Sequence, residues 1–271
     1  MNFDHFFLKL KNSFYIHGIL GTAYRILRYP FITLMIFSKR KVIFSSHNSR
    51  DIFINIYKTN WWGSAESFSG TGSTLAYTAN VRERLPDLFK KLSIKTIYDA
   101  PCGDFNWMKV VVDSNDIHYI GADIVPQLIE KSSASYGTKK VKFHTKNIIE
   151  DKFPSADLWI CRDCFIHFSF QDILLTLENF ASSDIPYLLT TTHINTKGFK
   201  NIDIKTGDVR LLDLFSHPFL LPHDSLYSID DWAGKDHPKQ LVLFSRHQII
   251  TALPKIKTLL KKNLVKIMRF D

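Results

Sequence analysis

The stretch Thr96–Phe105, T-I-Y-D-A-P-C-G-D-F, constrains the fold of this chain more than any other part of the sequence. The β-rich run Thr96–Tyr98 leads to a carboxylate at Asp99, a Pro-Cys-Gly turn follows, and a helical pattern begins at Asp104. This order of strand, tight turn and helix puts the turn at the carboxyl end of a strand, where open α/β sheets bind their ligands. Gly103 lacks a Cβ, so the backbone can approach a ligand closely there.

A second acid follows in the corresponding place of the next unit. The segment His118–Ile124, H-Y-I-G-A-D-I, predicts another short strand that ends at Asp123, about 20 residues after the turn. An acid at the tip of the second strand can accept hydrogen bonds from both hydroxyls of a ribose. Two strands, one glycine turn and one acid at this separation therefore predict a site for a nucleoside cofactor.

The charges around the turn favour one cofactor over others. A dinucleotide fingerprint needs G-x-G-x-x-G so that a pyrophosphate can lie at the helix N-terminus, but this turn offers only Gly103, flanked by Asp99 and Asp104. Two carboxylates repel a pyrophosphate and attract a sulfonium and an ammonium. The charges therefore favour S-adenosylmethionine (SAM) over NAD or FAD. The alternative is that the segment is only a polar strand-to-helix turn.

Residues 60–250 resemble a class I SAM-dependent methyltransferase, of a bacterial group associated with surface-glycan biosynthesis. The resemblance rests on five stretches, which are N-W-W-G-S-A-E-S-F-S-G-T-G-S (60–73), D-A-P-C-G-D-F-N-W-M (99–108), G-A-D-I-V-P (121–126), D-L-W-I-C-R-D-C-F-I-H-F-S (157–169) and N-I-D-I-K-T-G-D-V-R (201–210). It implies a SAM cofactor and a leader that covers the cofactor pocket.

Alternating strand and helix patterns predict an α/β fold with a Rossmann-like, open, mostly parallel sheet and helices on both faces. The resemblance implies seven strands. Strands are expected near 96–100, 118–123, 141–144, 158–162, 187–192 and 241–245, and helices near 75–92, 126–135, 171–180 and 256–267. We expect four parts: a basic helical extension (1–50), a leader (51–95), the SAM-binding domain (96–250) and a basic tail helix (251–271).

The residues expected to bind the cofactor lie on the turn and at three further strand ends. At the end of the third strand, Asn147 can pair with the adenine amine while Ile148 lies on the ring, although the resembling family often has Asp at that point. The full set is Asp99, Ala100, Pro101, Cys102, Gly103, Asp104, Asp123, Ile124, Asn147, Ile148 and Arg162.

Transfer of a methyl group to a hydroxyl requires the acceptor to lose a proton, and a well-placed base contributes about 10²–10⁴-fold to the rate. His167 and His193 follow the fourth and fifth strands, and Asp163 could orient either histidine or take the proton itself. Each histidine could instead be a hydrogen-bonded structural residue. The fourth strand ends in C-R-D-C rather than an Asn/Asp-Pro-Pro-aromatic turn, which argues against methylation of nucleobases.

Candidate acceptor contacts lie in the leader and in the long segment 194–239, whose many polar groups suggest a pocket for a polyhydroxylated molecule. They are Trp62, Glu66, Asn201, Asp203 and Arg210. An alternative is that the tryptophans of the leader anchor it in the core. A metal site formed by Asp163, Asp203 and His193 is conceivable, but nothing in their spacing demands one, so we expect none.

Three cysteines are too few for a disulfide framework and suggest a reducing compartment. Cys161 and Cys164 have CxxC spacing, but no second pair exists to complete a zinc site, so both are expected to be strand-end residues.

The net charge of +9 is concentrated at the two ends of the chain. Residues 1–50 carry eight Lys/Arg against one Asp and residues 251–271 carry six against one Asp, so residues 51–250 have a net charge of −3. A nucleic-acid enzyme would be expected to have its basic patch at the catalytic mouth, so no nucleic-acid partner is expected.

Both ends combine apolar and basic residues at helical spacing. The uninterrupted apolar run 29–38 is about half the ~20 residues that a spanning helix needs, and no secretory cleavage site follows it. These ends could lie on an anionic membrane surface, or they could pack on the domain. The expected location is cytoplasmic, with peripheral attachment to the inner face of the membrane as one possibility.

The resulting hypothesis is a SAM-dependent methyltransferase (EC 2.1.1 class) that O-methylates a sugar hydroxyl of a surface glycan or its precursor. Two alternatives remain open. One is a methyltransferase-like fold that binds a membrane surface without turnover, and the other is an enzyme that methylates a small metabolite or a lipid.

Overall fold

The computed structural model describes residues 33–46, 48–234 and 237–267. The chain divides into two compact units, Met1–His47 and Asn48–Asp271, and each is described by itself. Residues 33–43 of the first unit form a helix. The sequence-based expectations for residues 1–32 lie outside the described residues.

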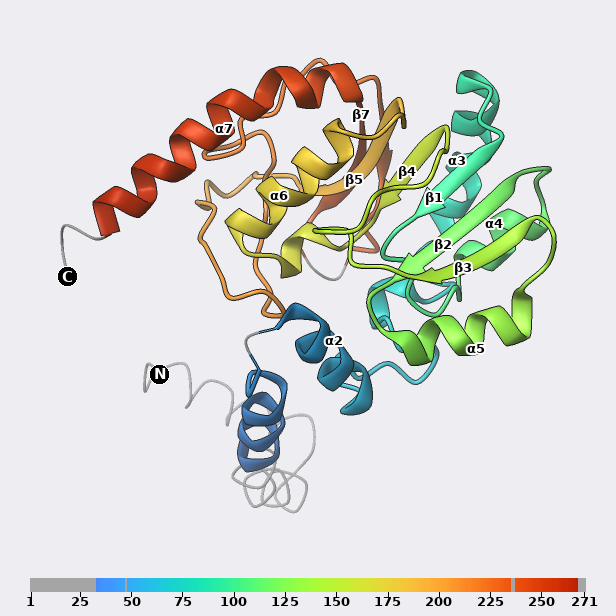
Figure 1. Ribbon diagram of the computed structural model, residues 1–271, viewed down its shortest axis with the longest axis horizontal. Helices are drawn as coiled ribbons and strands as arrows, with labels where there is room; N and C mark the ends of the chain where they lie inside the picture. Colours follow the sequence, from blue (N-terminus) through green and yellow to red (C-terminus); the bar gives the residue numbers. More distant parts are fainter. Residues whose placement is uncertain (1–32, 47, 235–236, 268–271) are drawn as a thin grey trace, which may run out of the picture. The chain divides into compact units, whose positions relative to one another are not determined.

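The second unit contains alternating strands and helices (Figure 1). Its helices are α2 (Ser49–Lys58), α3 (Ala79–Leu92), α4 (Met108–Asp113), α5 (Pro126–Tyr136), α6 (Phe170–Ala181) and α7 (Arg246–Ile267), with short 3₁₀ turns η1 (Thr71–Ser73) and η2 (Phe165–His167). Its strands are β1 (Thr96–Asp99), β2 (His118–Asp123), β3 (Val141–Thr145), β4 (Leu158–Cys161), β5 (Tyr187–His193), β6 (Tyr227–Asp230) and β7 (Lys239–Ser245).

The sheet has seven strands in the order β3-β2-β1-β4-β5-β7-β6. The five strands β1 to β5 pair in parallel, and β7 pairs antiparallel with both β5 and β6. The parallel strands therefore end along one edge of the sheet, with the tips of β2, β1 and β4 side by side. The predicted Rossmann-like, mostly parallel sheet of seven strands is confirmed.

Helices cover both faces of the sheet, and each face has its own apolar core. On one face, α3 and α4 contribute Leu85, Leu88 and Met108 against Ile97 of β1. On the other face, residues of α6 and α7, including Ile256, pack with buried residues of β4 and β5. The strands β4 and β5 are buried almost throughout, which explains why they read as continuous apolar runs.

Most of the sequence-predicted boundaries agree with the structure to within two residues, but several predictions were incomplete. The helical pattern expected from Asp104 becomes a helix only at Met108, and α2 was not assigned from the sequence. The helix expected at 75–92 begins only at Ala79 and continues through Pro86 without a break. The strand β6, at the sheet edge, was not assigned from the sequence, because its four residues lie inside the long polar segment 194–239. The C-terminal helix begins at Arg246, ten residues earlier than expected.

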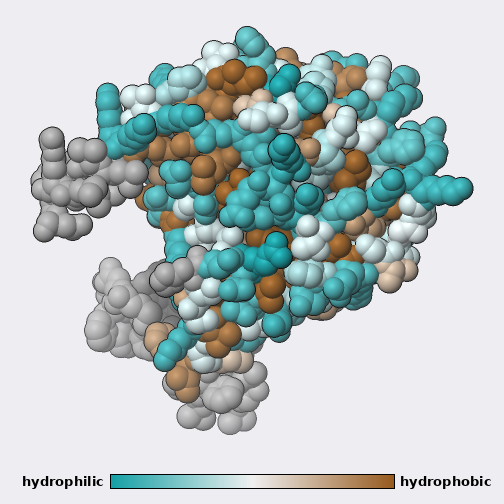
Figure 2. Space-filling model, in the orientation of Figure 1, coloured by the Kyte–Doolittle hydropathy of each residue, from teal (hydrophilic) through white to brown (hydrophobic). Residues whose placement is uncertain are grey.

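The C-terminal helix α7 packs on the domain through buried Leu253, Ile256 and Leu260, and Lys257 forms an ion pair with Glu178 of α6. For the part of α7 with described side chains, the alternative of packing on the domain is therefore the observed one. None of the helices in the described ranges is both long and apolar enough to span a lipid bilayer. Hydrophilic residues cover much of the face shown in Figure 2, and hydrophobic ones form separate small patches.

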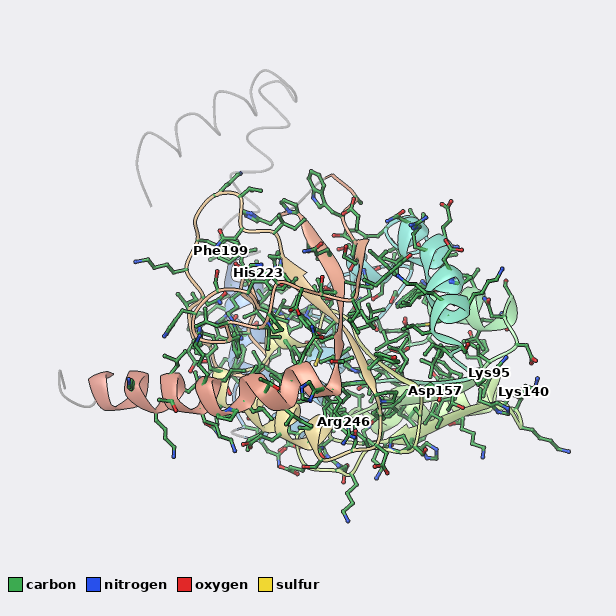
Figure 3. The ribbon with its side chains drawn as sticks, turned by 90° about the horizontal axis from the view of Figure 1, so that it is seen from above. Lys95, Lys140, Asp157, Phe199, His223 and Arg246 are labelled. Carbon is green, nitrogen blue, oxygen red and sulfur yellow. The ribbon has the colours of Figure 1, made fainter. Side chains whose placement is uncertain are left out.

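At the amino end of the parallel strands, Asp157 joins the starts of β4 and β1. One carboxylate oxygen, Oδ2, accepts hydrogen bonds from the backbone N–H groups of Lys95 and Thr96 at 2.8 and 2.7 Å. Figure 3 shows Asp157 and Lys95 close together at this end. Charged acceptors of this kind make strong hydrogen bonds.

Replacing Asp157 with Ala removes both hydrogen bonds and is expected to lower the free energy of unfolding by about 2 kcal/mol. Urea denaturation followed by circular dichroism measures this change. The matched control is Asp184→Ala, which removes an exposed carboxylate and is expected to change stability by about 0.5 kcal/mol or less. Equal losses in the two variants would contradict the role given to Asp157.

Candidate active site

Two adjoining cavities open at the carboxyl edge of the sheet. The first, here called the β2–β3 cavity, is lined by the tips of β2 and β3, by α2 and by apolar side chains that include Phe53 and Phe168. The second, the β1–β4 cavity, is lined by the tips of β1 and β4, by leader residues 69–73 and by Lys239. Seven residues line both cavities, namely Trp62, Ser69, Pro101, Gly103, Asp123, Asp163 and His167.

Asp99 and Asp123 are the carboxylates at the tips of β1 and β2, and both are almost fully buried. Burial raises the pKa of Asp99 to about 7, although the hydroxyl of Tyr119 donates a 2.6 Å hydrogen bond to it. Burial also raises the pKa of Asp123 to about 6, against the hydrogen bonds that its carboxylate accepts from the backbone N–H groups of Gly103 and Val125. Each carboxylate therefore carries a desolvation cost that a bound cation or hydroxyl donor would relieve.

The turn between them has two residues in the left-handed region, Gly103 (φ +56°) and Phe105 (φ +60°). A Cβ on Gly103 would lie 2.0 Å from Ser69 Oγ, so the leader packs directly against this glycine. Phe105 is buried against the rings of Tyr119 and Phe143, at centroid distances of 4.7 and 5.1 Å. This aromatic packing stabilises a backbone conformation that is unfavourable for a non-glycine residue.

The leader is fastened to the turn by two acids that the sequence suggested as ligand contacts. Asp104 accepts hydrogen bonds from Ser67 Oγ at 3.0 Å and from the Phe68 backbone N–H at 2.8 Å. Glu66 accepts from the Leu75 N–H and from Asn106 Nδ2, which lowers the pKa of Glu66. Neither acid lines a cavity. Their hydrogen bonds hold the leader against the turn.

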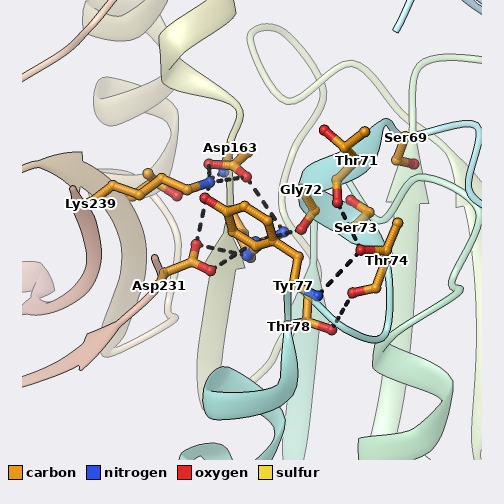
Figure 4. Close-up of polar contacts among 12 residues, drawn as sticks. Ser69, Thr71, Gly72, Ser73, Thr74, Tyr77, Thr78, Asp163, Asp231 and Lys239 are labelled. Carbon is orange, nitrogen blue, oxygen red and sulfur yellow. Dashed lines mark hydrogen bonds and ion pairs between the residues drawn. The ribbon is translucent and has the colours of Figure 1, made fainter. Parts of the chain in front are cut away.

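A buried ion cluster lies at the tip of β4. Arg162 donates to both oxygens of Asp231, at 2.9 and 2.8 Å, and to the carbonyl of Gly72 in the leader. Lys239 Nζ donates to both oxygens of Asp163, at 2.6 and 2.5 Å (Figure 4). Burial alone would raise the pKa of Asp163, but the charges of Lys239 and Arg162 outweigh it and hold this pKa well below its usual value.

His167 is held in one neutral tautomer. Its Nδ1 lies 2.8 Å from the carbonyl oxygen of Asp208, which can only accept, so Nδ1 carries the hydrogen and Nε2 keeps its lone pair. Burial lowers the pKa of His167, which keeps the ring neutral near pH 7. The indole of Trp62 lies 5.2 Å from the imidazole, between ring centroids.

His193, the other histidine considered as a base, lines neither cavity. Its Nδ1 lies 3.2 Å from the backbone nitrogen of Leu212 and 3.3 Å from the carbonyl oxygen of the same residue. Burial lowers the pKa of His193 as well. The structure therefore brings His167 and Asp163 together and leaves His193 in the packing of the segment after β5.

Two of the three candidate acceptor contacts in this segment hold the loop that carries His167. Arg210 donates to the carbonyl oxygens of Phe168 and Phe165, and Asp203 accepts from the Phe170 N–H. Asn201 bonds within its own segment, to the backbone of Asp213 and His217. None of the three lines a cavity, and contact between them and an acceptor stays a prediction.

The remaining residues predicted to contact the cofactor or the acceptor also divide into those that line a cavity and those that do not. Pro101, Cys102, Ile124, Asn147, Ile148, Arg162 and Trp62 line one or both cavities. Ala100 is buried beneath the turn, where its carbonyl accepts from Trp159 Nε1. Within the described ranges, no three His, Cys, Asp or Glu side chains could hold a metal ion. Cys161 and Cys164 are buried free thiols, as the strand-end interpretation predicts.

Sequence reasoning missed Lys239 and Asp231, which complete the ion cluster. Both lie in the unassigned region around β6 and the start of β7, more than 60 residues from Arg162 and Asp163. The only signal in the sequence was a lysine at the start of an apolar strand. Sequence reasoning also missed Phe53 and Tyr57 of α2, which line the β2–β3 cavity.

No family model matches the sequence, and a search of the curated proteins finds no match. Solved structures do match. A SAM-dependent methyltransferase from Leishmania major is 12% identical, with 73% of this chain and 85% of that chain covered and a TM-score of 0.55. This likeness establishes the fold.

Two further structures give lower scores. Magnesium protoporphyrin IX methyltransferase from Synechocystis, solved with bound SAH, is 13% identical, with 73% of this chain and 97% of that chain covered and a TM-score of 0.49. Human N-acetylserotonin methyltransferase, in complex with SAM, is 12% identical, with 74% and 57% covered and a TM-score of 0.49.

The raised pKa of Asp99 predicts a pH-dependent effect on stability. An acid whose pKa is higher in the folded protein than in the unfolded chain contributes stability below pH 4, and this contribution is lost as the pH rises through 7. Asp99→Asn keeps an acceptor for Tyr119 but cannot ionise. It should therefore be more stable than the wild type at pH 8 and lose most of this advantage at pH 5, as measured by urea denaturation. A constant difference between the two proteins at both pH values would contradict the prediction.

Replacing Gly103 with Ala is expected to loosen the leader, because the new Cβ would clash with Ser69. The control is Gly198→Ala, since Gly198 also has a positive φ, +68°, but has no atom within 4 Å of the added Cβ. Both variants bear the cost of the left-handed backbone, about 1 kcal/mol. Only Gly103→Ala should increase hydrogen exchange at the amides of residues 66–73. Equal exchange in the two variants would show that the contact does not hold the leader.

Proposed function

We propose that this chain is a SAM-dependent methyltransferase that methylates a hydroxyl group. The observation that carries the proposal is the pair of buried carboxylates, Asp99 and Asp123, which face the cavities at the tips of adjacent strands on either side of the Gly103 turn. The fold, which is that of methyltransferases, supports it.

The cavity residues fit SAM in charge and shape. Asp123 is placed to accept hydrogen bonds from the two ribose hydroxyls, and Ile124 and Ile148 offer apolar surface to the adenine. Asn147 lies at the tip of β3, although its side-chain oxygen already accepts from the Ile149 N–H. The negative charge of Asp99 favours the α-ammonium group. A pyrophosphate would meet repulsion from the same two carboxylates.

SAM, when bound, supplies a methyl group on a sulfonium, which is the electrophile of the reaction. His167 Nε2 is the proposed base for the proton of the acceptor hydroxyl, and the hydrogen bond from Nδ1 to the carbonyl oxygen of Asp208, which leaves Nε2 its lone pair, supports this role. The new bond joins the methyl carbon to the hydroxyl oxygen, the carbon–sulfur bond breaks, and neutral S-adenosylhomocysteine (SAH) remains. Trp62 and leader residue Ser69 line both cavities.

The acceptor that fits best is a sugar hydroxyl of a surface glycan or of its precursor. The β1–β4 cavity carries Thr71, Ser73 and Tyr77 beside Asp163, which together offer hydroxyl and carboxylate partners to a polyhydroxylated molecule. An indole such as that of Trp62 provides a flat apolar surface of the kind that covers a sugar ring. No nucleic-acid acceptor is proposed.

The helix formed by residues 33–43 supports attachment of the enzyme to the inner face of a membrane. Leu34 and Phe37 are 65% and 67% exposed, and the cations Lys39, Arg40 and Lys41 follow after Ser38. Apolar side chains beside a cluster of cations are typical of segments that bind anionic lipid surfaces.

Isothermal titration calorimetry on the full-length protein tests the cofactor assignment. SAM and SAH are expected to bind, whereas NAD and FAD are not. Asp123→Ala should weaken both affinities about tenfold or more, because charge-assisted hydrogen bonds to the ribose are lost. Asp113→Asn, which changes an exposed carboxylate outside the cavities, should bind as the wild type does.

Failure of the wild type to bind SAM and SAH would overturn the proposal, and binding of a nicotinamide or flavin instead would identify a different cofactor. An unchanged affinity in Asp123→Ala would overturn the ribose assignment and leave the choice of cofactor standing.

A further inference from the structure

The ion cluster contains an unusual feature, a carboxylate that faces the cavity but is already neutralised. Asp163 follows β4 with φ +51°, a conformation that few non-glycine residues adopt, and its side chain lines both cavities. Lys239 contacts both of its oxygens. The side chain of Lys239 is 7% exposed and that of Asp163 is 21% exposed, so the carboxylate is the partner closer to the open space.

The other charges around Asp163 are already matched with each other. Arg162 binds Asp231 through two hydrogen bonds, and the Arg162–Asp163 separation is longer, 3.5 Å. His167, also near Asp163, is neutral in the tautomer fixed by Asp208. The charge of Asp163 toward the cavity is therefore set mainly by Lys239, whose distance to Asp231 is 3.6 Å.

The order of the strands indicates which part of the cofactor Asp163 would face. The tips of β2, β1 and β4 lie side by side, and they carry Asp123, Asp99 and Asp163 in that order. This step rests on the proposed function, in which Asp123 binds the ribose. The sulfonium is attached to the ribose through one methylene group, so it extends from β2 toward β1 and β4, where Asp163 lies.

A carboxylate beside the sulfonium would stabilise the substrate more than the transition state. Methyl transfer disperses the positive charge and leaves neutral SAH, so an unpaired carboxylate would bind the reactant tightly and gain less from the transition state. It would also favour SAM over its product. A carboxylate paired with Lys239 has a much weaker electrostatic field in the cavity. It therefore neither binds the reactant more tightly than the transition state nor favours SAM over SAH.

We propose that Lys239 is a specificity-determining residue, which by pairing with Asp163 equalises the affinity of the cavity for charged SAM and for neutral SAH. Asp163 remains available to accept a hydrogen bond from the acceptor hydroxyl. The pair therefore provides a fixed polar group at the site of reaction without a net charge.

Calorimetric titration of the full-length protein with SAM and with SAH tests this proposal without an acceptor. In Lys239→Met, Asp163 loses its partner, and the ratio of the SAH to the SAM dissociation constant should rise about tenfold relative to the wild type. In Asp163→Asn/Lys239→Met, both charges are absent and the ratio should return to the wild-type value. A merely structural role for Lys239 would change both affinities together and leave the ratio alone.

Two further variants complete the design. Lys239→Arg keeps the charge and should keep the wild-type ratio. Lys109→Met removes an exposed lysine that pairs with Asp113 outside the cavities, so it controls for the chemical change alone. If Lys239→Met does not fold, as judged by circular dichroism, Asp163→Asn carries the test, since it removes the main counterion of Lys239 and should lower the ratio.

The outcomes are distinguishable from a failure of the proposed function. If the wild type binds neither SAM nor SAH, the proposed function is wrong. The other outcome is that the wild type binds both SAM and SAH, with Lys239→Met and Asp163→Asn each keeping the wild-type ratio of dissociation constants. In that case only the role of Lys239 is overturned.

Discussion

The burial of two carboxylates at neighbouring strand tips is the constraint on which the arrangement of the site depends. Asp99 and Asp123 are 3% and 7% exposed, and a carboxylate loses much of its hydration free energy at such a depth. The protein offsets only part of this loss, through Tyr119 and the backbone N–H groups of Gly103 and Val125. The position of the turn, its left-handed residues and the aromatic packing beneath Phe105 all follow from presenting these groups to one cavity.

Acidic residues at the edge of the sheet serve two different purposes. Asp99, Asp123 and Asp163 face the cavities, whereas Asp104 and Glu66 bind backbone and side-chain donors of the leader. The distinction matters because the two groups alternate in the sequence. A carboxylate one residue after the glycine points to the leader, and the carboxylate before the turn points to the ligand space.

The fold was predictable from the sequence because strand and turn patterns are local. The strand Thr96–Asp99, the turn and the acid at Asp123 could be identified from short segments, and the parallel order followed from alternation with helices. The ion cluster could not be predicted, since Arg162 meets Gly72 and Asp231 only through tertiary packing. Polar residues of the segment after β5, such as Arg210, resemble ligand contacts in sequence, yet their hydrogen bonds go to the loop that carries His167.

The hydrogen bonds made by Arg162 also have a consequence for biosynthesis. This guanidinium joins a carbonyl 90 residues nearer the N-terminus to a carboxylate 69 residues nearer the C-terminus. As the chain leaves the ribosome, β1 to β5 are complete before Asp231 and Lys239 emerge. Until then Arg162 and Asp163 lack their main counterions, and burying them would be costly. The ion cluster is therefore complete only after the β6–β7 hairpin, in which Asp231 and Lys239 lie, has been synthesised and has docked beside β5.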